Sequence, residues 1–368
     1  MKFTIDKTSL IKPLSHIQSI VERRNTIPIL SNVVIKAQNG ILSLSATDMD
    51  IDILENIECN VLEEGNATIT AHILYEIVKK LPDGSELILE KNNNNATLKS
   101  NKSKFTLPLL PIEDYPDISD GELDHSFLIS SGNFRRLIDR TKFAISLEET
   151  RYYLNGIFFH SLNKHIVAVA TDGHRLAKAS VPLPLCAENL EGIIVPRKTI
   201  NEIRKLIDEF PSDTEINISF SDSRIKFKAG QTILTSKLID GNFPDYEKVI
   251  PSENKNILNI DSQLLTESID RVSTIFSDKS RSIKLIIAND TLKLDASSPD
   301  TGFASEEIQV DYSGQDLNIG FNARYLLDIT SQIGSGEITI LFDDDGSPAL
   351  INSKNDNQAC FVIMPMRI

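Results

Sequence analysis

The sequence predicts an α+β protein made of three tandem copies of one module, each with two helices packed on antiparallel sheets. Three observations predict this architecture. Alternating apolar residues in the order strand, tight turn, strand recur in three stretches, and two amphipathic helix patterns accompany each of them. The chain of 368 residues also exceeds what one hydrophobic core usually serves, and one third of it, about 123 residues, is close to the commonest domain size.

The strand stretches share their turn chemistry. They are SNVVIKAQNGILSLSATD at 31–48, RYYLNGIFFHSLNKHIVAVATDGHRLA at 151–177 and SIKLIIANDTLKLDASSPD at 282–300. The middle stretch has a polar tip at Asn163 and Lys164 and a second tight turn at Asp172 and Gly173, because glycine tolerates positive φ. We therefore expect a β-meander in each module.

The first module opens with a short strand over 3–5, and its first helix is expected to start near Thr8 as the N-cap. Its apolar stripe has the spacing i, i+4, i+7, i+11 in all three copies: Leu10, Leu14, Ile17 and Val21; Phe134, Ile138, Thr141 and Ile145; Leu265, Ile269, Val272 and Phe276.

The second helix of each module gives the sharper repeat. The triplets Leu74, Ile77 and Leu81, Ile200, Ile203 and Ile207, and Leu326, Ile329 and Ile333 each lie on one helical face, about 126 residues apart. Breakers follow each triplet. The six helices are expected at 7–24, 72–81, 131–142, 197–207, 262–281 and 322–331.

The first two modules end alike, because KFTLPLLPIEDYPDI at 104–118 and ILTSKLIDGNFPDYEKVI at 233–250 each run a strand into an aromatic-Pro-Asp turn. These turns predict modules at 1–121, 122–250 and 251–368. Inside the first module, the Asn92 to Asn95 run is expected at a hairpin tip.

Composition narrows the class of protein. Cys59, Cys186 and Cys360 are far apart in the sequence and predict neither a disulfide framework nor a metal site, and no motif calls for a cofactor. The N-terminus lacks the apolar core of a signal peptide, and no apolar run approaches a membrane span. We expect a soluble protein of the reducing cytoplasm.

Charge is segregated along the chain. The net charge is −14, yet the six expected helices together carry about +10, which leaves about −24 for the rest. Lysine and arginine also favour solvated helix faces, so this pattern alone leaves two interpretations open. If the helices share one surface, that surface would attract a phosphate backbone without reading base sequence.

Several motifs then identify a family. RYYLNG at 151–156, ATDGHRLA at 170–177, SKLIDGNFPDY at 236–246 and MPMR at 364–367, together with IPIL at 27–30, resemble the bacterial β sliding clamp, the processivity subunit of DNA polymerase III. The resemblance covers essentially the whole chain. It implies a head-to-tail homodimer that closes a ring of six modules, with helices lining the hole and sheets outside.

The resemblance also implies a function without catalysis. The ring would encircle duplex DNA independently of sequence, slide, and tether the replicative polymerase and other replication and repair proteins after an ATP-dependent clamp loader has opened it. A basic lining within an acidic exterior suits such loose binding, because tight phosphate contacts would stop sliding.

The resemblance carries a partner-peptide pocket over to the central and last modules. Its residues are Leu154, Thr171, Gly173, His174, Arg175, Leu176, Pro244, Val249, Asn322, Tyr325, Val362, Met364, Pro365, Met366 and Arg367. Methionines give adaptable apolar contacts, and Pro365 suits an exposed edge because it cannot donate to a sheet ladder. Ser280 and Lys248 stand where some family members have an aromatic residue and an arginine, which predicts a less apolar outer wall.

Two further sets follow from the resemblance. The DNA-side candidates are Arg24, Arg136, Arg140, Tyr152, Tyr153, Arg197 and Lys198, although the acidic pair Glu148 and Glu149 is unexpected beside them. The dimer-interface candidates are Lys102, Lys104, Phe105, Leu107, Ile275, Glu306 and Glu307, where opposite charges would guide assembly.

Two other classes of function compete with this interpretation. One is an enzyme that uses Asp172 and His174, with His160 or His165, for acid-base chemistry. It lacks a nucleophile motif, a phosphate loop and metal-ligand spacing. The other is a structural repeat scaffold without a DNA role, against which the basic helices argue. An open assembly in place of a closed ring is also compatible with the sequence.

Overall fold

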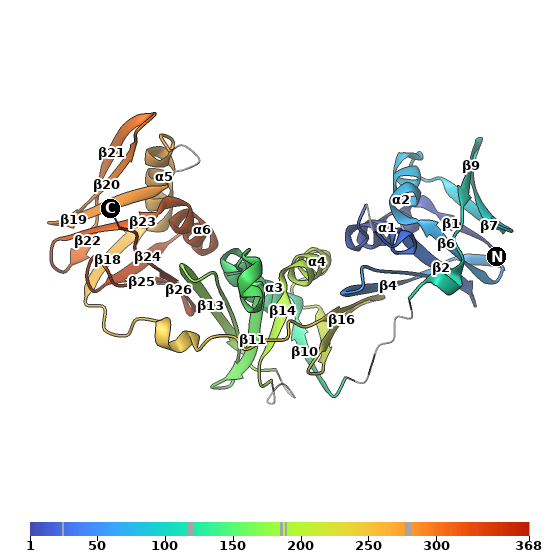
Figure 1. The fold of residues 1–368 in the computed structure, drawn as a ribbon, viewed down its shortest axis with the longest axis horizontal. Helices are drawn as coiled ribbons and strands as arrows, with labels where there is room; N and C mark the ends of the chain where they lie inside the picture. Colours follow the sequence, from blue (N-terminus) through green and yellow to red (C-terminus); the bar gives the residue numbers. More distant parts are fainter. Residues whose placement is uncertain are drawn as a thin grey trace. The chain divides into compact units, whose positions relative to one another are not determined.

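The computed structural model describes residues 1–23, 26–116, 121, 123–184, 187, 190–276 and 281–367. Figure 1 shows helices and antiparallel sheets along the whole chain. The α-helices in the described part are α1 (Lys7–Ile20), α2 (Ala71–Lys80), α3 (Ser131–Thr141), α4 (Arg197–Ile207), α5 (Ser262–Ser273) and α6 (Ala323–Ile333). Within the described residues, no helix is long and apolar enough to cross a membrane.

The chain divides into two compact units. Unit 1 comprises 1–132 and 201–238, and unit 2 comprises 133–200 and 239–368. Each unit therefore contains part of the expected central module, joined to the first module in unit 1 and to the last module in unit 2.

Unit 1 contains two antiparallel sheets. The first has the order β5 (Asn60–Glu63), β1 (Lys2–Asp6), β7 (Glu86–Asn92), β8 (Asn95–Ser100) and β9 (Ser103–Pro108). The second has the order β10 (His125–Ser130), β15 (Glu215–Phe220), β16 (Arg224–Ala229), β17 (Thr232–Lys237), β4 (Ile51–Glu58), β3 (Ile41–Thr47), β2 (Asn32–Gln38) and β6 (Gly65–Thr70). Pairing of β17 with β4 makes the second sheet continuous across the two modules.

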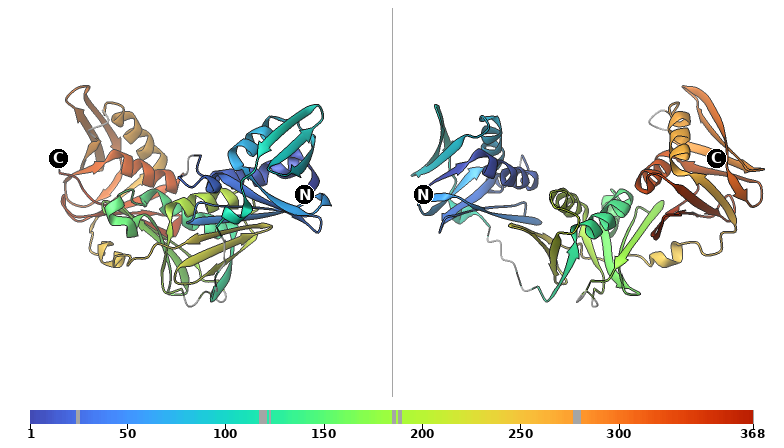
Figure 2. Two further views of the ribbon diagram at one scale, coloured as in Figure 1. Left: turned by 45° about the vertical axis from the view of Figure 1, so that its right-hand side comes forward. Right: turned by 180° about the vertical axis from the view of Figure 1, so that it is seen from behind.

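Unit 2 repeats this plan with two further sheets. One has the order β14 (Ile193–Pro196), β11 (Gly156–Leu162), β12 (His165–Thr171), β13 (Arg175–Pro182), β26 (Asp356–Ile363), β25 (Ala349–Ser353), β24 (Glu337–Phe342), β18 (Asn256–Asp261) and β22 (Asp311–Ser313). The other has the order β21 (Gly302–Gln309), β20 (Thr291–Ser298), β19 (Ser282–Ala288) and β23 (Leu317–Asn322). Figures 1 and 2 show β13 and β26 side by side, where the central and last modules share a sheet.

The predicted turns are confirmed by their backbone angles. Asn39 and Gly40 have φ of 51° and 76°, Asn163 and Lys164 have 49° and 63°, and Asn289 and Asp290 have 50° and 58°. Two successive positive φ values define the hairpin turn that matches strand twist. The same turn thus recurs in the three repeats, and Asn93 in the predicted 92–95 tip also has a positive φ of 49°.

The apolar stripes form the core. Leu14, Ile17, Ile138 and Ile269 are fully buried, and so are Ile200 and Ile329 of the second-helix triplets. Burying such a side chain contributes about 1.5–3 kcal/mol. The helix periodicity of the sequence therefore predicted the helix faces that cover the sheets.

Several predicted helix ends are wrong. Helix α1 begins at Lys7 behind Asp6, so Thr8 is not its N-cap, and it ends at Ile20 because Val21 is extended, with φ −72° and ψ 127°. The helix expected over 262–281 ends at Ser273. There the Thr274 hydroxyl donates to the carbonyl of Arg271 at 2.7 Å, a local bond of the kind that competes with helix continuation.

Candidate functional site

The predicted partner pocket lies in unit 2, on the shared sheet of the central and last modules. Strand β13 pairs with β26, so that Leu176 faces Val362, and the backbone N–H of Met364 donates to the carbonyl of His174 at 2.9 Å. Leu176 and Val362 pack with Tyr246, which belongs to the segment η5 (Tyr246–Val249) that joins the two modules. The structure therefore brings together predicted residues from both modules.

The pocket residues divide by exposure. Leu154, Leu176 and Val362 are buried and can only form a floor, whereas Val249, Met364 and Met366 are 45%, 36% and 41% exposed. Exposed apolar side chains beside a buried apolar floor are what a docking site for an apolar peptide requires. Pro244 and Arg367 are exposed as well, and Pro365 is half-buried.

The turn between β12 and β13 is fixed by its own side chains. The Asp172 carboxylate accepts the backbone N–H groups of His174 and Arg175 at 2.9 and 3.0 Å, and the Thr171 hydroxyl donates to the carbonyl of Arg175 at 2.7 Å. Gly173 has φ +87°, and a Cβ on it would lie 2.4 Å from Nη1 of Arg151. The sequence Thr-Asp-Gly-His-Arg is therefore explained locally, with Asp172 acting as a turn residue.

Arg175 was predicted to belong to the pocket, but its guanidinium is not available to a bound peptide. Its Nη1 donates to Asp328 at 2.5 Å, its Nη2 to the carbonyl of Phe143 at 2.7 Å and its Nε to Asp172 at 3.1 Å. Its side chain is only 10% exposed. Arg175 therefore joins the central module to α6 of the last module, while its backbone supports the pocket.

Asn322 and Tyr325, two predicted pocket residues, lie at the start of α6. The Asn322 side chain accepts the backbone N–H of Arg324 at 3.0 Å and is the N-cap of the helix. Tyr325 stacks under the Arg175 guanidinium. Both residues line a cleft of about 520 Å³, together with His174 and several basic side chains.

The predicted DNA-side residues behave differently from one another. Arg136 and Arg140 both pair with Asp356 of β26, and Arg136 also donates to the carbonyl of Ser180 at 2.7 Å. These two arginines therefore connect the central and last modules, and their place in the DNA-side set stays a prediction. Arg24 lies outside the described residues.

The remaining DNA-side residues stay accessible. Tyr152 is 54% exposed and contacts Tyr153 edge to face, with ring centres 5.9 Å apart. Arg197 is exposed and Lys198 is half-buried. The unexpected Glu148 pairs with Arg151 at 2.7 Å, so its charge is matched locally.

Most of the predicted dimer residues lie on two sheet edges, one in each unit. Strand β9, which carries Lys104, Phe105 and Leu107, is the edge of its sheet, and β21, which carries Glu306 and Glu307, is the edge of another. An edge strand presents unpaired backbone N–H and C=O groups that can pair with another chain.

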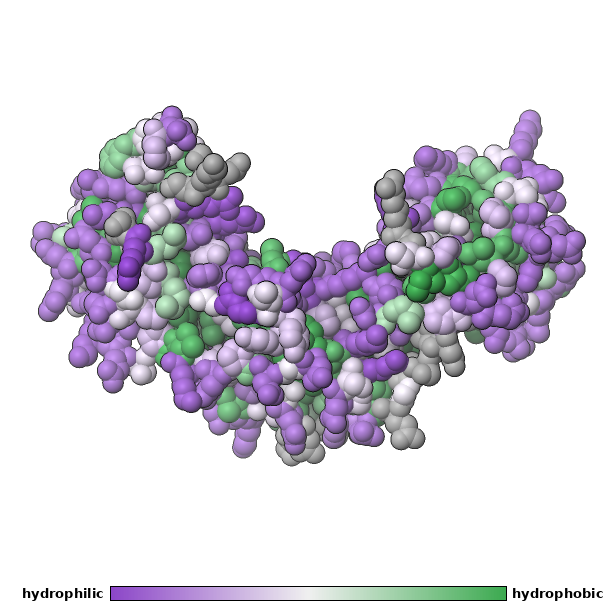
Figure 3. All heavy atoms as spheres, in the orientation of Figure 1, coloured by the Kyte–Doolittle hydropathy of each residue, from purple (hydrophilic) through white to green (hydrophobic). Residues whose placement is uncertain are grey.

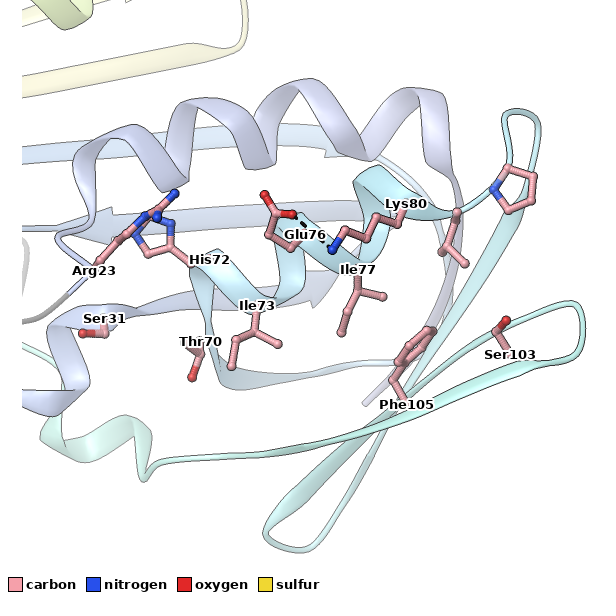
Figure 4. Close-up of a pocket in the computed structure, with 12 residues that line it drawn as sticks. Arg23, Ser31, Thr70, His72, Ile73, Glu76, Ile77, Lys80, Ser103 and Phe105 are labelled. Atoms are coloured by element: carbon pink, nitrogen blue, oxygen red, sulfur yellow. Dashed lines mark ion pairs between the residues drawn. The ribbon is translucent and has the colours of Figure 1, made fainter.

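A cleft of about 1000 Å³ lies beside β9 in unit 1. Figure 4 shows Ile73 and Ile77 of α2 and Phe105 of β9 pointing into the same space, with Glu76 and Lys80 paired above it. Ile73 is 49% exposed. The space-filling view also shows hydrophobic surface on the N-terminal part of the chain (Figure 3).

The acidic members of the dimer set are not equivalent. Arg271 donates to Glu306 at 2.6 Å, and this hydrogen bond lowers the pKa of the Glu306 carboxyl. Glu307 is exposed on the same strand. Glu307 is therefore the better candidate to meet a lysine from another chain. Ile275 lies just after α5 and is half-buried.

The histidines of the rival enzyme hypothesis have different hydrogen-bond partners. His160 lies 2.8 Å from the Tyr246 hydroxyl, and burial lowers its pKa. The backbone N–H of His174, and not its ring, donates the hydrogen bond to Asp172 that the described residues show. No group of three or more His, Cys, Asp or Glu side chains in the described ranges could hold a metal ion. Cys186 and Ser280 lie outside those ranges.

Several residues were missed from the sequence. Phe143, Asp328 and Lys142 line the cleft beside Arg175, and Ile73, Ile77 and Glu76 line the cleft beside β9. No motif marks them. The spacing of Ile77 in its triplet assigned it to the core. The one sequence signal for a second apolar face on α2 is Ile73, an apolar residue one turn before Ile77.

Comparison with known proteins agrees with these features. Three family models match the chain, described as the N-terminal, central and C-terminal domains of the DNA polymerase III beta subunit, over residues 1–119, 128–245 and 247–367. The β sliding clamp of Caulobacter vibrioides is 44% identical over 374 residues, and that of Escherichia coli is 32% identical over 369 residues, each covering 100% of both chains.

Solved structures give the same result. A sliding clamp from Bartonella birtlesii, crystallised with griselimycin, is 42% identical, covers 100% of both chains and superposes with a TM-score of 0.97. A Pseudomonas aeruginosa clamp is 37% identical with a TM-score of 0.95, again over the whole of both chains. The fold is therefore three tandem clamp domains, and the chain belongs to the DNA polymerase III β subunit family, the β sliding clamps.

Proposed function

We propose that two copies of this chain close head to tail into a ring around duplex DNA and act as a processivity clamp. The module boundaries 1–121, 122–250 and 251–368 are part of this proposal. The observation that carries it is the pair of open sheet edges, β9 and β21, on the first and last modules of one chain. Two different edges on one chain make a heterologous contact, and two such contacts close a dimer.

The cleft beside β9 supports the same junction. Ile73, Ile77 and Phe105 offer apolar surface next to the edge, while Lys102 and Lys104 are exposed beside it. An apolar centre with charged residues around it is the usual anatomy of a specific protein interface. In the dimer, the Ile275 region would enter this cleft and Glu307 would face the lysines.

DNA would be held through its phosphate backbone, without recognition of the base sequence. The candidates that remain accessible are Tyr152, Tyr153, Arg197 and Lys198, with Arg24 as a further candidate outside the described residues. Contacts of this kind bind phosphates and carry no base information. Weak contacts inside a closed contour would let the ring slide without dissociating.

Partner proteins would dock on the pocket of unit 2. Exposed Met364, Met366 and Val249 would supply the apolar surface for the peptide, and buried Leu176 and Val362 would support it from below. The expected partners are the replicative polymerase, an ATP-dependent clamp loader and other proteins that carry a short clamp-binding peptide. The protein itself is proposed to be non-catalytic and to act in the cytoplasm.

Retention on DNA tests this function. The protein, loaded by a clamp loader onto a nicked circular plasmid, should co-elute with the plasmid in gel filtration and should be lost when the plasmid is cut once. Equal retention on circular and linear DNA would contradict topological binding, because only a ring can slide off an end.

A further inference from the structure

The cleft of about 520 Å³ in unit 2 contains more cations than its own carboxylates can neutralise. It lies between the segment that follows α3, the turn after β12, and the first turns of α4 and α6. Its basic residues are Lys142, Arg175, Arg197, Arg281 and Arg324, and its acidic residues are Glu148, Asp172 and Asp328.

The carboxylates of this cleft are already paired. Asp172 and Asp328 both accept from Arg175, and Glu148 pairs with Arg151 at 2.7 Å. Lys142 pairs in turn with Asp139 at 2.9 Å. These pairs leave the other three arginines of the cleft without a neutralising partner.

Arg197, Arg281 and Arg324 are those arginines. Across the part of the chain that the structure describes, no hydrogen bond or ion pair engages their guanidinium groups. Arg197 and Arg324 are exposed and Arg281 is half-buried. A guanidinium presents a rigid fork of donors that matches a phosphate group in a bidentate manner.

Two of these arginines occupy unfavourable helix positions. Arg197 is the first residue of α4 and Arg324 the second residue of α6, and neither helix has an acidic residue in its first turn. The start of a helix carries partial positive charge, so a cation there is destabilising and an anion is stabilising. Both helices have 11 residues, and both direct this charge at one cleft.

The first backbone donors of both helices are already used. The N–H groups of Arg197 and Ala323 donate to the carbonyls of Asn155 and Arg281, and that of Arg324 donates to Asn322. An anion in the cleft would therefore be held by the guanidinium groups, with the two helix dipoles adding a favourable field.

We propose that this cleft binds a phosphate group through Arg197, Arg281 and Arg324. The phosphate can come from the backbone of duplex DNA or from a soluble phosphate compound. The first source rests on the proposed clamp function, and it adds Arg281 and Arg324 to the DNA-side residues. A bound phosphate would also connect two modules, because Arg197 belongs to the central module and Arg281 and Arg324 belong to the last module.

The test compares four full-length proteins: wild type, R281Q/R324Q, R281K/R324K and the control K164Q/K255Q. Lys164 and Lys255 are exposed and lie outside the cleft, so the control removes the same charge elsewhere. Inorganic phosphate is added at constant ionic strength and the melting temperature is recorded. A labelled 20-base-pair duplex is titrated separately at several salt concentrations.

We expect phosphate to raise the melting temperature of the wild type, the control and the lysine variant, but not that of R281Q/R324Q. We also expect R281Q/R324Q to bind the duplex about tenfold more weakly, with a slope of log affinity against log salt that is smaller by about one to two. Loss of the phosphate effect with unchanged duplex binding would assign the site to soluble phosphate.

Equal phosphate responses and equal duplex affinities in all four proteins would overturn the proposal. A wild type that responds to phosphate but is not retained on circular DNA would instead overturn the clamp function and leave this site intact. Unchanged melting of R281Q/R324Q in chloride checks that the variant folds.

Discussion

The guanidinium of Arg175 lies over the ring of Tyr325, 4.2 Å from the ring centre, and 5.1 Å from the ring centre of Phe143 on the other module. It also bonds Asp172 and Asp328. One arginine therefore fixes the last module on the central module, next to the turn that carries His174.

Replacing Arg175 by alanine should destabilise unit 2 by about 3 kcal/mol, because Asp172 and Asp328 would lose the partner of a mostly buried ion pair. Urea unfolding measures this. R175K should recover little, since an ammonium cannot replace the planar stacking and the three directed bonds. The matched control R271A removes an exposed pair with Glu306 and should cost far less. Equal losses in both alanine variants would contradict the role of Arg175.

His16 predicts a pH dependence in unit 1. Its Nδ1 lies 2.6 Å from Glu55 and its Nε2 2.7 Å from Glu209, which links α1 to the strand β4 and to the end of α4. Burial alone would lower the pKa of His16, but its hydrogen bonds to the two glutamates outweigh burial and raise the pKa above 6.5. Both bonds are complete only when both ring nitrogens carry protons.

Because the pKa of His16 is raised on folding, its contribution to stability is full below pH 6.5 and is lost as pH rises through the folded-state pKa. H16Q should therefore lose on the order of 1 kcal/mol at pH 6 and less at pH 9. His16 lines a cleft together with the charged or polar side chains of Lys12, Tyr75, Glu202 and Lys205. The control is H174Q, which replaces an exposed histidine that does not line this cleft. A wild-type to H16Q difference that grows with pH would refute the bridge.

Charge reversal at Lys102 and Lys104 should weaken the dimer about tenfold, since these exposed lysines flank the β9 edge and would meet Glu307 of the other chain. Sedimentation equilibrium at low salt measures the dissociation constant. K36E/K228E applies the same charge change to exposed positions on other strands of unit 1 and should leave it unchanged. The placement of the interface fails if both double variants behave like the wild type.

Met364→Ala should lower the affinity for a clamp-binding peptide about tenfold without affecting dimerisation, because it removes exposed apolar surface just after β26, where the Met364 backbone bonds His174. Fluorescence anisotropy with a labelled peptide measures the affinity. Leu264→Ala removes a side chain of similar exposure on α5 and serves as control. Peptide binding that survives in M364A and falls in L264A would move the pocket elsewhere.

Local patterns in the sequence predicted the repeated architecture well. The leucine and isoleucine triplets of the second helices predict the helix period, and the Asn-Gly, Asn-Lys and Asn-Asp turns predict positive φ. Helix ends were less predictable, because the end of α5 depends on hydroxyl bonds near Thr274 that periodicity does not reveal.

The candidate site could be predicted only as a set of residues. Arg175 and Asp328 are 153 positions apart, and Arg136 and Asp356 are 220 apart, so nothing near either arginine in the sequence marks its partner. The same limit applies to Arg281 and Arg324. They line one cleft with Arg197 only because of how the central and last modules pack. Long-range ion pairs therefore give Arg175 and Arg136 partners that the sequence does not reveal.

The central claim is that two chains close a ring, and electron microscopy of the purified protein tests it most directly. Class averages at micromolar concentration should contain a six-domain ring with a central hole. A compact three-domain particle without a hole, or an open filament, would contradict the account.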